Sequence, residues 1–426
     1  MKLIYNFYIF LFLLTFSYLS FADVDENSLK EIPELKNNYT NNVPTTDKRA
    51  TNSNLFHVEL THRSIDTKRC YASALIKHAL RFRSNKGLSK RVSKPQALGA
   101  VNYANDVEWI CQISLGTPQQ SFLVALDTAS SDLWVPCIDC YNCNNKRLFN
   151  YSKSSTIQYN DDDFSITYAD GSGSNGWIEQ DTLQVGYMTI KSQIFAIIYD
   201  ISSAFQSDVI DGVLGLGYDS LSVYPGTQTP FTNMIKQGLI PQQIFSVQLR
   251  PARNKTAYGG IFVFGGIDTS LYKGSITYTP VTLKSFWQIG LDAVEYNGKA
   301  ITTTSKSKQQ AIVDTATALL ILGTNVVTTL HTNIKGKYDT ASKTWQVPCN
   351  LNSNVKVSIR INGVSFAINY LDLVREKVSS TSSWCYSGIA STDDSTWILG
   401  GVFMKNYYVI FDRAKNQVGF ATPVYN

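Results

Sequence analysis

Histidine is scarce in this sequence: only four of its 426 residues are histidine, and His331 is the one that follows residue 91. A serine or cysteine nucleophile that needs a histidine base would depend on this residue alone. A histidine-rich zinc site is excluded for the same reason. We interpret His331 as an ordinary surface or capping histidine, and we expect neither a metal nor a cofactor.

Long apolar runs are absent after the first 22 residues. The start of the chain combines Lys2, a mostly apolar run to Ser17 and the small-x-small sequence Ser20-Phe21-Ala22. This pattern predicts that residues 1–22 are a signal peptide, with a membrane anchor as the alternative. We therefore expect a secreted, extracellular protein without a stable membrane anchor; an acidic vacuole is the alternative destination.

Excess positive charge is lacking from most of the chain, although the formal net charge is +5. Residues 92–426 contain 24 Lys and Arg against 25 Asp and Glu, whereas residues 48–91 contain eleven Lys and Arg against Glu59 and Asp66. A nearly neutral main part argues against a nucleic-acid-binding protein. The basic block is instead expected to pair with acidic groups of the same chain.

Seven cysteines are present, and six of them follow residue 100, which fits an oxidising compartment. Three Asn-X-Ser/Thr sequons are glycosylation candidates on the secretory path. They are Asn38, Asn150 and Asn254.

From about residue 105, short runs rich in β-branched and aromatic residues alternate with Gly, Asn, Asp and Ser. Helical patterns are few, and residues 231–237 and 325–334 are the clearest. We predict an all-β fold, mostly β with a few short helices. The run GSGSNG at 171–176 matches a dinucleotide-binding fingerprint, but the sequence after it indicates a strand and not a helix. We therefore predict a hairpin with a Gly/Ser tip there.

An internal repeat gives the strongest information on organisation. LDTASS at 126–131 recurs as VDTATA at 313–318. An apolar pair and a glycine follow each copy, with Leu214 87 positions after Asp127 and Leu399 85 positions after Asp314. This spacing predicts two copies of one β unit around a two-fold axis, with the two Asp-Thr turns facing each other at the interface.

Two carboxyl groups placed in this way have a chemical use. Like charges a few ångström apart do not both ionise readily, so one group keeps a proton while the other is charged. Asp127 and Asp314 would then share one water: the charged group takes its proton, and the protonated group donates to the scissile carbonyl. A single Asp-Thr dipeptide would indicate only a turn. Four hydroxyl residues are expected to support the pair: Thr128 and Thr315 in the turns, and Ser130 and Thr317 at the outer carboxylate oxygens.

The motifs LDTASSDLWVP, ITYADGSGSNG, DGVLGLG, IVDTATALL and WILGGVFMKNYYVIFD occur in this order. In these motifs the chain resembles the pepsin family of aspartic proteases, from about residue 105 to its end. NDVEW, CYNC at 140–143 and TPFTNMIKQGLI are most similar to the rhizopuspepsin-like secreted enzymes of mucor-type fungi. The resemblance implies a bilobal pepsin-like fold with an N-terminal lobe, residues 92–283, and a C-terminal lobe, residues 284–426. It also implies a monomeric endopeptidase that hydrolyses proteins or peptides at acid pH and is made as a zymogen.

The resemblance assigns roles to individual residues. Asp127 and Asp314 match the catalytic dyad. Tyr168 matches the flap tyrosine, and Trp134 the tryptophan whose indole N–H holds it. Asp170 matches the flap aspartate that accepts a lysine side chain before the cleaved bond; a turn-forming residue is the alternative.

The resemblance also implies two disulfide bonds, which pair Cys140 with Cys143 and Cys349 with Cys385. Cys111 and Cys137 have no counterpart in it. They are expected to bridge each other, or Cys137 to compete for Cys143.

The resemblance implies that residues 23–91 are the propeptide, which in the family lays a strand and a helix across the cleft and aims a cation at the dyad. Arg81 is our candidate for this cation, with Lys77 second; a solvated helix face is the alternative. Acid would protonate carboxylates, weaken their pairing with the basic block and release it.

Three alanines depart from the family pattern, because Ala129, Ala316 and Ala169 stand where its members carry glycine. Each adds a methyl group where chain and substrate approach closely. The alternative function is therefore a pepsin-fold protein that binds peptides but cleaves them weakly or not at all.

Overall fold

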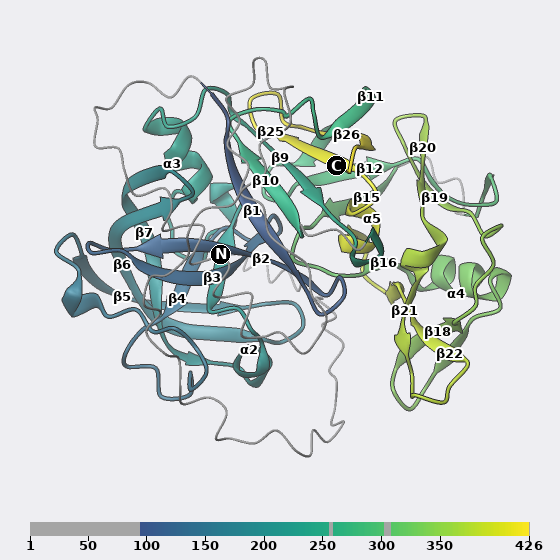
Figure 1. Ribbon diagram of the computed structural model, residues 1–426, viewed down its shortest axis with the longest axis horizontal. Coiled ribbons are helices and arrows are strands. Elements are labelled where there is room, and N and C mark those ends of the chain that lie inside the picture. Colours follow the sequence, from purple (N-terminus) through teal and green to yellow (C-terminus); the bar gives the residue numbers. More distant parts are fainter. Residues whose placement is uncertain (1–93, 255–258, 302–307, 426) are drawn as a thin grey trace, which may run out of the picture.

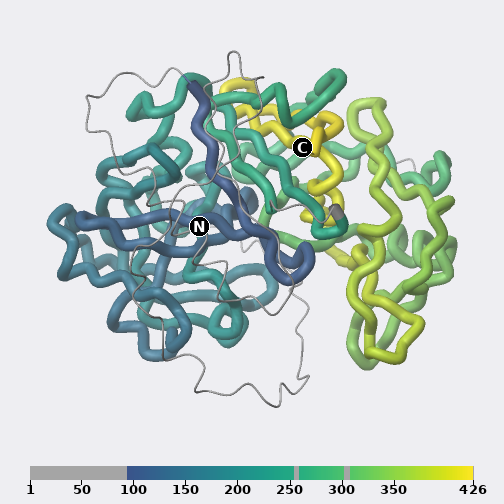
Figure 2. The backbone as a smooth tube through the Cα atoms, viewed as in Figure 1, coloured from purple at the N-terminus to yellow at the C-terminus, as the bar shows by residue number. Residues whose placement is uncertain are grey.

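The computed structural model describes residues 94–254, 259–301 and 308–425, with the side chain of Asn254 excluded. Several predictions therefore lie outside the described residues: the signal peptide 1–22, the propeptide 23–91 with Arg81 and Lys77, and the sequon at Asn38. The described chain is mostly β, with few short helices, as predicted. Figures 1 and 2 show its first half (blue to teal) and its second half (green to yellow) as two lobes side by side.

A six-stranded antiparallel sheet joins the two lobes. Its strands, in spatial order, are β1 (Gln96–Tyr103), β10 (Gly260–Phe264), β9 (Ile244–Leu249), β25 (Tyr408–Asp412), β26 (Gln417–Pro423) and β11 (Tyr272–Leu283). Phe245 of β9 stacks on Phe411 of β25 with ring centroids 4.6 Å apart, and Trp287 meets both rings edge-on. Burial of these large apolar side chains holds the two halves of the chain together.

The N-terminal lobe is built from seven strands: β2 (Glu108–Leu115), β3 (Gln120–Asp127), β4 (Leu133–Pro136), β5 (Gln158–Thr167), β6 (Gly173–Val185), β7 (Met188–Ile201) and β8 (Gly212–Gly215). β3 runs parallel to β8, β8 antiparallel to β4, and β4 parallel to β7. β5 and β6 form an antiparallel hairpin, as predicted, but its loop is residues 168–172, and residues 173–176 of the predicted tip belong to β6.

The C-terminal lobe repeats this arrangement. β15 (Gln309–Val313) runs parallel to β24 (Thr396–Leu399), β24 antiparallel to β16 (Leu320–Gly323), and β16 parallel to β23 (Ile389–Thr392). The duplicated β unit predicted from the sequence repeat is therefore confirmed. β12 (Gln288–Leu291) pairs with both β11 and β15 and so links this unit to the joining sheet.

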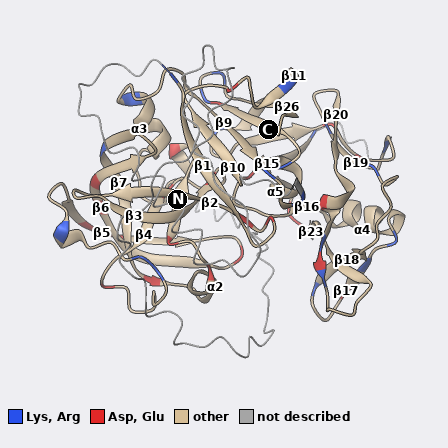
Figure 3. Cartoon of the chain, viewed as in Figure 1, with Lys and Arg blue, Asp and Glu red and all other residues tan. Residues whose placement is uncertain are grey.

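Two smaller four-stranded sheets complete the C-terminal lobe. One contains β14 (Lys299–Ala300), β13 (Ala293–Tyr296), β19 (Val357–Ile361) and β20 (Val364–Ile368); the other contains β17 (Lys337–Asp339), β18 (Thr344–Pro348), β22 (Trp384–Ser387) and β21 (Val374–Lys377). In Figure 3 the basic and acidic residues of the described chain are scattered over both lobes.

The described helices are short. They are α2 (Ser203–Ser207), α3 (Pro230–Lys236), α4 (Thr324–Asn333) and α5 (Gly401–Met404). Both predicted helices are present and begin one residue earlier than expected. Thr229 caps α3 by accepting a hydrogen bond from the Thr232 N–H, and Pro230 occupies the first turn, where its missing N–H is harmless. Within the described residues, no helix combines the length and the apolar character needed to cross a membrane.

The interpretation of His331 as a surface or capping histidine is wrong. It is fully buried on α4, with Nδ1 2.8 Å from the Val327 carbonyl oxygen and Nε2 2.9 Å from Ser387 Oγ. Its ring stacks on Trp345 at 4.3 Å between centroids. Burial lowers its pKa to about 4, so the ring stays neutral over a wide pH range and serves packing.

Cysteine pairing follows the family pattern in part. The structure contains the bonds Cys140–Cys143 and Cys349–Cys385. The expected alternatives for the remaining pair are wrong, because Cys111 and Cys137 are both unbonded and fully buried. Burial raises the pKa of both thiols, that of Cys137 to about 11, so neither is a reactive thiolate.

Candidate active site

Asp127 ends β3, and Asp314 directly follows β15. The parallel neighbour of each strand holds the turn in place: the Leu216 N–H donates to the Asp127 carbonyl oxygen at 2.6 Å, and the Asp314 N–H donates to the Leu399 carbonyl oxygen at 3.1 Å. Asp127 is 6% exposed and Asp314 is 0% exposed. Two acidic side chains are thus buried at equivalent ends of the duplicated unit.

The two turns are cross-linked by their threonines. The Thr128 N–H donates to Thr315 Oγ1 at 3.1 Å, and the Thr315 N–H donates to Thr128 Oγ1 at 3.0 Å. Each hydroxyl in turn donates to a backbone carbonyl of the opposite lobe, Thr128 to Val313 and Thr315 to Leu126. All four donors of this hydrogen-bond network, two N–H groups and two hydroxyls, bind acceptors of the opposite turn or lobe. The two turns are therefore fixed relative to each other.

Each aspartate also accepts hydrogen bonds from its own turn. The Ala129 N–H lies 2.8 Å from Asp127 Oδ1, and Ser130 Oγ lies 2.5 Å from Oδ2. At Asp314 the same distances, 2.8 Å and 2.5 Å, separate Oδ1 from the Ala316 nitrogen and Oδ2 from Thr317 Oγ1. These bonds orient both carboxyl groups before any substrate arrives.

The pKa of both carboxyl groups is raised. Burial raises the pKa of Asp127 to about 7, and the negative charge of Asp314 adds to this effect. Burial also raises the pKa of Asp314, against the hydrogen bonds from Thr317 and Ala316. Since two adjacent buried carboxylates repel each other, the pair keeps one proton in acid solution.

The departures from glycine create no backbone strain. The backbone at Ala129, Ala169 and Ala316 lies outside the left-handed region that favours glycine. All three are only half-buried, and the N–H groups of Ala129 and Ala316 keep their bonds to the carboxylates. Alanine therefore preserves the geometry of both turns.

Glycine is needed instead at two equivalent positions behind the turns. A Cβ on Gly215 would lie 2.4 Å from backbone atoms of Ser131, and one on Gly400 would lie 2.3 Å from the carbonyl oxygens of Thr317 and Leu319. Only glycine allows the neighbouring strand to approach the turn this closely. This contact explains why the sequence repeat contains a glycine after each apolar pair.

The flap loop lies between β5 and β6. The Trp134 indole N–H donates to the Tyr168 hydroxyl at 2.8 Å, and the Phe205 ring packs edge-on against both rings. Burial raises the pKa of the Tyr168 hydroxyl well above its ordinary value. The loop closes where the Tyr168 N–H donates to the Ser172 carbonyl oxygen at 2.7 Å, and Gly171 takes the left-handed φ of 81° that the turn requires.

Asp170 stabilises this turn. Its Oδ1 accepts hydrogen bonds from the Ser172 N–H at 2.8 Å and from Ser172 Oγ at 2.6 Å. These contacts support the turn-forming role, which was the alternative for this residue.

Asn150 is the only candidate glycosylation site whose side chain the structure describes. It is half-buried and accepts a hydrogen bond from Ser152 Oγ.

Sequence reasoning missed Asp132, five positions after Asp127. It is buried, and its two oxygens accept hydrogen bonds from Ser222 Oγ at 2.6 Å and the Val223 N–H at 3.1 Å. It fixes the segment after β8 to the Asp127 turn. The available signal was a lone acidic residue before the apolar run Leu133–Pro136.

The described residues contain no group of three or more His, Cys, Asp or Glu side chains suited to a metal ion.

A family model described as eukaryotic aspartyl protease matches residues 108–423. Pepsin A from Bos taurus is 36% identical over 324 residues, which cover 74% of this chain and 84% of the relative. Rhizopuspepsin from Rhizopus chinensis is 34% identical over 322 residues, or 75% and 79% of the two chains. Rhizopuspepsin-1 from Rhizopus niveus is 33% identical over 361 residues, or 84% and 89%. The predicted resemblance is confirmed, and the chain belongs to the eukaryotic aspartyl protease family.

Proposed function

We propose that this chain is an aspartic endopeptidase in which Asp127 and Asp314 share the attacking water and hydrolyse peptide bonds in proteins at acid pH. The supporting observation is the pair of buried carboxyl groups on equivalent turns that Thr128 and Thr315 cross-link. Such a pair holds one proton and one negative charge, as water activation requires.

The residues act in sequence. The charged carboxylate takes a proton from the water as its oxygen attacks the scissile carbonyl carbon, and the protonated carboxyl donates to the carbonyl oxygen. The resulting tetrahedral intermediate collapses as its C–N bond breaks. The pair then donates a proton to the leaving nitrogen and takes one from a hydroxyl of the intermediate, so it ends with one proton, as it began. Ser130 and Thr317 hold the outer oxygens, so the carboxyl groups keep their orientation while the proton moves.

The flap has a separate task. We propose that Tyr168, held by Trp134, covers the bound peptide and excludes bulk water from the dyad. Acceptance of a substrate lysine by Asp170 remains a prediction beside its role in the turn.

The precursor state is part of the proposal. Secretion, the propeptide 23–91 with Arg81 or Lys77 as its latch, the lobe boundary at 283/284 and a monomeric state are predictions from the sequence. The basic block at 48–91 and the acidic dyad are complementary in charge.

A direct test uses the full-length chain. After acidification it should process itself and cleave a denatured protein, and Asp314→Asn should do neither. Cleavage should decline as the pH rises through about 7, because the pair then loses its remaining proton. Correctly folded wild-type protein that performs neither reaction at any acid pH would reject the proposal.

The replacement of family glycines by Ala129, Ala169 and Ala316 is the sequence feature that favours the second candidate function, a peptide-binding protein that cleaves weakly. Their backbone geometry argues against it. We expect Ala129→Gly and Ala316→Gly to change kcat/KM by less than about threefold, since the bonds to the carboxylates use backbone N–H groups that glycine also has. A gain of 100-fold or more, on the order of a lost 1 Å alignment, would instead support the weakly cleaving protein.

A further inference from the structure

The outer strand of the flap hairpin contains a bulge. The pairing of β5 with β6 shifts register between Tyr159 and Asp162, and Asp161 takes a left-handed φ of 58°. A bulge bends its strand and interrupts the regular ladder of hydrogen bonds. The outer strand beyond the bulge leads to Tyr168 and the flap loop, whereas β6 beside it stays paired with β7 as far as Ser174. The bulge is therefore the place where the outer strand and the flap loop can move.

A single hydroxyl group spans this bulge. The Tyr224 hydroxyl donates to Asp162 Oδ2 and accepts a hydrogen bond from Asn160 Nδ2 at 3.0 Å. Asn160 lies within the register shift, and Asp162 is the first paired residue on its flap side. The hydroxyl therefore fixes the bulge to the strand on its flap side, while the Tyr224 ring packs against the hydrophobic cluster that contains Trp134 and Phe205.

Tyr224 is itself anchored to the turn that holds Asp127. Its N–H donates to Ser222 Oγ at 3.3 Å, and Ser222 Oγ donates to the buried Asp132 at 2.6 Å. The Gly217 N–H in the same segment donates to the Ser130 carbonyl oxygen at 2.8 Å. A continuous set of hydrogen bonds thus runs from the candidate catalytic turn to the hinge of the flap.

We propose that Tyr224 is a positioning residue whose hydroxyl locks the flap hinge and sets the flap in register with Asp127. The inference rests on the proposed function, because a closing flap matters only to a protein that binds peptides. Asn160 and Asp162 are exposed, so water can replace the hydroxyl when it is removed. The fold then survives, whereas the hinge loosens and the flap spends less time closed.

The test is Tyr224→Phe, which keeps the ring and deletes only the hydroxyl. In the full-length chain after acidification, kcat/KM for a peptide long enough to lie under the flap should fall about tenfold, mainly through KM. Amide hydrogen exchange at residues 162–173 should become faster by a similar factor, with the melting temperature unchanged within about 2 °C. Tyr159→Phe is the matched control, since Tyr159 is 56% exposed on the same strand and its hydroxyl has no hydrogen bond within the described chain.

Asp162→Ala removes the acceptor instead and should have the same effect. Combining the two substitutions should lower kcat/KM no further than either one alone, since both remove the same hydrogen bond between Tyr224 and Asp162. Unchanged exchange and kinetics in Tyr224→Phe, or equal changes in Tyr159→Phe, would overturn the inference. If the wild type cleaves no peptide, the proposed function fails, and the exchange measurements still decide whether the hinge exists. If Tyr224→Phe unfolds, Asp162→Ala decides.

Discussion

Replacing Asp127 by asparagine is expected to reduce peptide hydrolysis by about 1,000-fold or more and to stabilise the folded chain at pH 7. The loss of activity follows because the amide of asparagine neither takes a proton from the water nor shares one with Asp314. The asparagine oxygen can still accept the hydrogen bond from the Ala129 N–H, and the Ser130 hydroxyl can turn to accept one from the amide NH2 group, so the turn should keep its shape.

The expected gain in stability, like the loss of activity, comes from removing the ionisable carboxyl group of Asp127. Burial and the Asp314 charge raise the pKa of Asp127 to about 7, from an ordinary value of 3.8. The folded chain therefore binds this proton more strongly than the unfolded chain. The resulting stability is present below pH 3.8 and is lost as the pH rises through 7, by at most about 4 kcal/mol. Asparagine is uncharged throughout and escapes this loss.

Urea unfolding of both proteins at pH 4 and pH 7.5 measures the effect. The free energies of unfolding should be similar at pH 4, and the variant should be the more stable one at pH 7.5. Asp170→Asn serves as a control because asparagine keeps the oxygen that accepts the hydrogen bonds from Ser172. Parallel stability curves for wild type and Asp127→Asn would show that the two carboxyl groups do not interact as the site requires.

The sequence repeat predicted the core of the site for a physical reason. A strand that ends in Asp-Thr and a parallel partner that must approach it closely leave a short pattern in each lobe, and the glycines at 215 and 400 are part of it. The strands and the helices α3 and α4 could also be predicted from the sequence, because each leaves a local periodic pattern of apolar residues. The periodicity depends only on neighbours in the chain, and the repeat occurs twice within it, so one sequence is enough to read both signals.

Features formed by segments that are distant in the chain could not be predicted from the sequence. His331 is buried because Trp345 and Ser387, from two other strands, cover its ring and bind its nitrogen. Asp132 lies inside the LDTASSDLWVP motif, but its role, like that of Tyr224, depends on partners 62 to 91 positions away. The pairing of Cys111 and Cys137 was not predictable, because counting cysteines does not show which of them bond; both lie unbonded in the same hydrophobic core.

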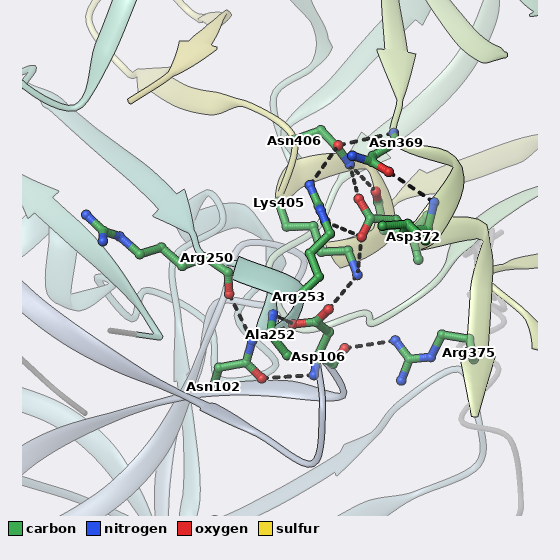
Figure 4. A network of polar contacts seen from close by, with 12 residues as sticks. Asn102, Asp106, Arg250, Ala252, Arg253, Asn369, Asp372, Arg375, Lys405 and Asn406 are labelled. Carbon is green, nitrogen blue, oxygen red and sulfur yellow. Dashed lines mark hydrogen bonds and ion pairs between the residues drawn. The ribbon is translucent and has the colours of Figure 1, made fainter. Parts of the chain in front are cut away.

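Replacing Lys405 by methionine is expected to lower the free energy of unfolding by about 3–5 kcal/mol at neutral pH. Lys405 Nζ lies 2.7 Å from Asp106 Oδ2 and 3.2 Å from Asp372 Oδ1, and the side chains of all three residues are at most 8% exposed (Figure 4). Methionine fills much of the same volume but leaves two buried carboxylates short of their shared cation. Arg253 and Asn406 still bind Asp372, so the larger loss falls on Asp106.

This cluster also holds a strained turn. Ala104, Asn105 and Asp106, between β1 and β2, adopt left-handed φ values of 47°, 60° and 69° in succession. Such conformations cost non-glycine residues about 1–2 kcal/mol each. The Lys405 bond ties this turn to the end of α5, 299 positions away in the chain. Loss of the bond should therefore free the β1–β2 turn first, before the lobes unfold.

The pH dependence distinguishes the ion pair from simple packing. Burial alone would raise the pKa of Asp106, but the charge of Lys405, together with hydrogen bonds from Lys405, Asn102 and Ala252, outweighs burial and holds that pKa below its ordinary value. A lowered carboxyl pKa contributes stability that is present at neutral pH and lost as the pH falls through the folded-state value. The deficit of Lys405→Met should accordingly be largest at pH 7 and smaller at pH 3, where Asp106 in the variant takes up a proton.

Denaturant unfolding at these two pH values, with Lys299→Met as the control, tests the prediction. Lys299 is exposed on β14, so its replacement should change stability by less than about 0.5 kcal/mol. Adding Asp106→Asn to Lys405→Met should recover part of the loss at pH 7, because it removes the uncompensated charge. A Lys405→Met protein as stable as the control, or one whose deficit is the same at both pH values, would show that the cation does not hold the β1–β2 turn to the C-terminal lobe.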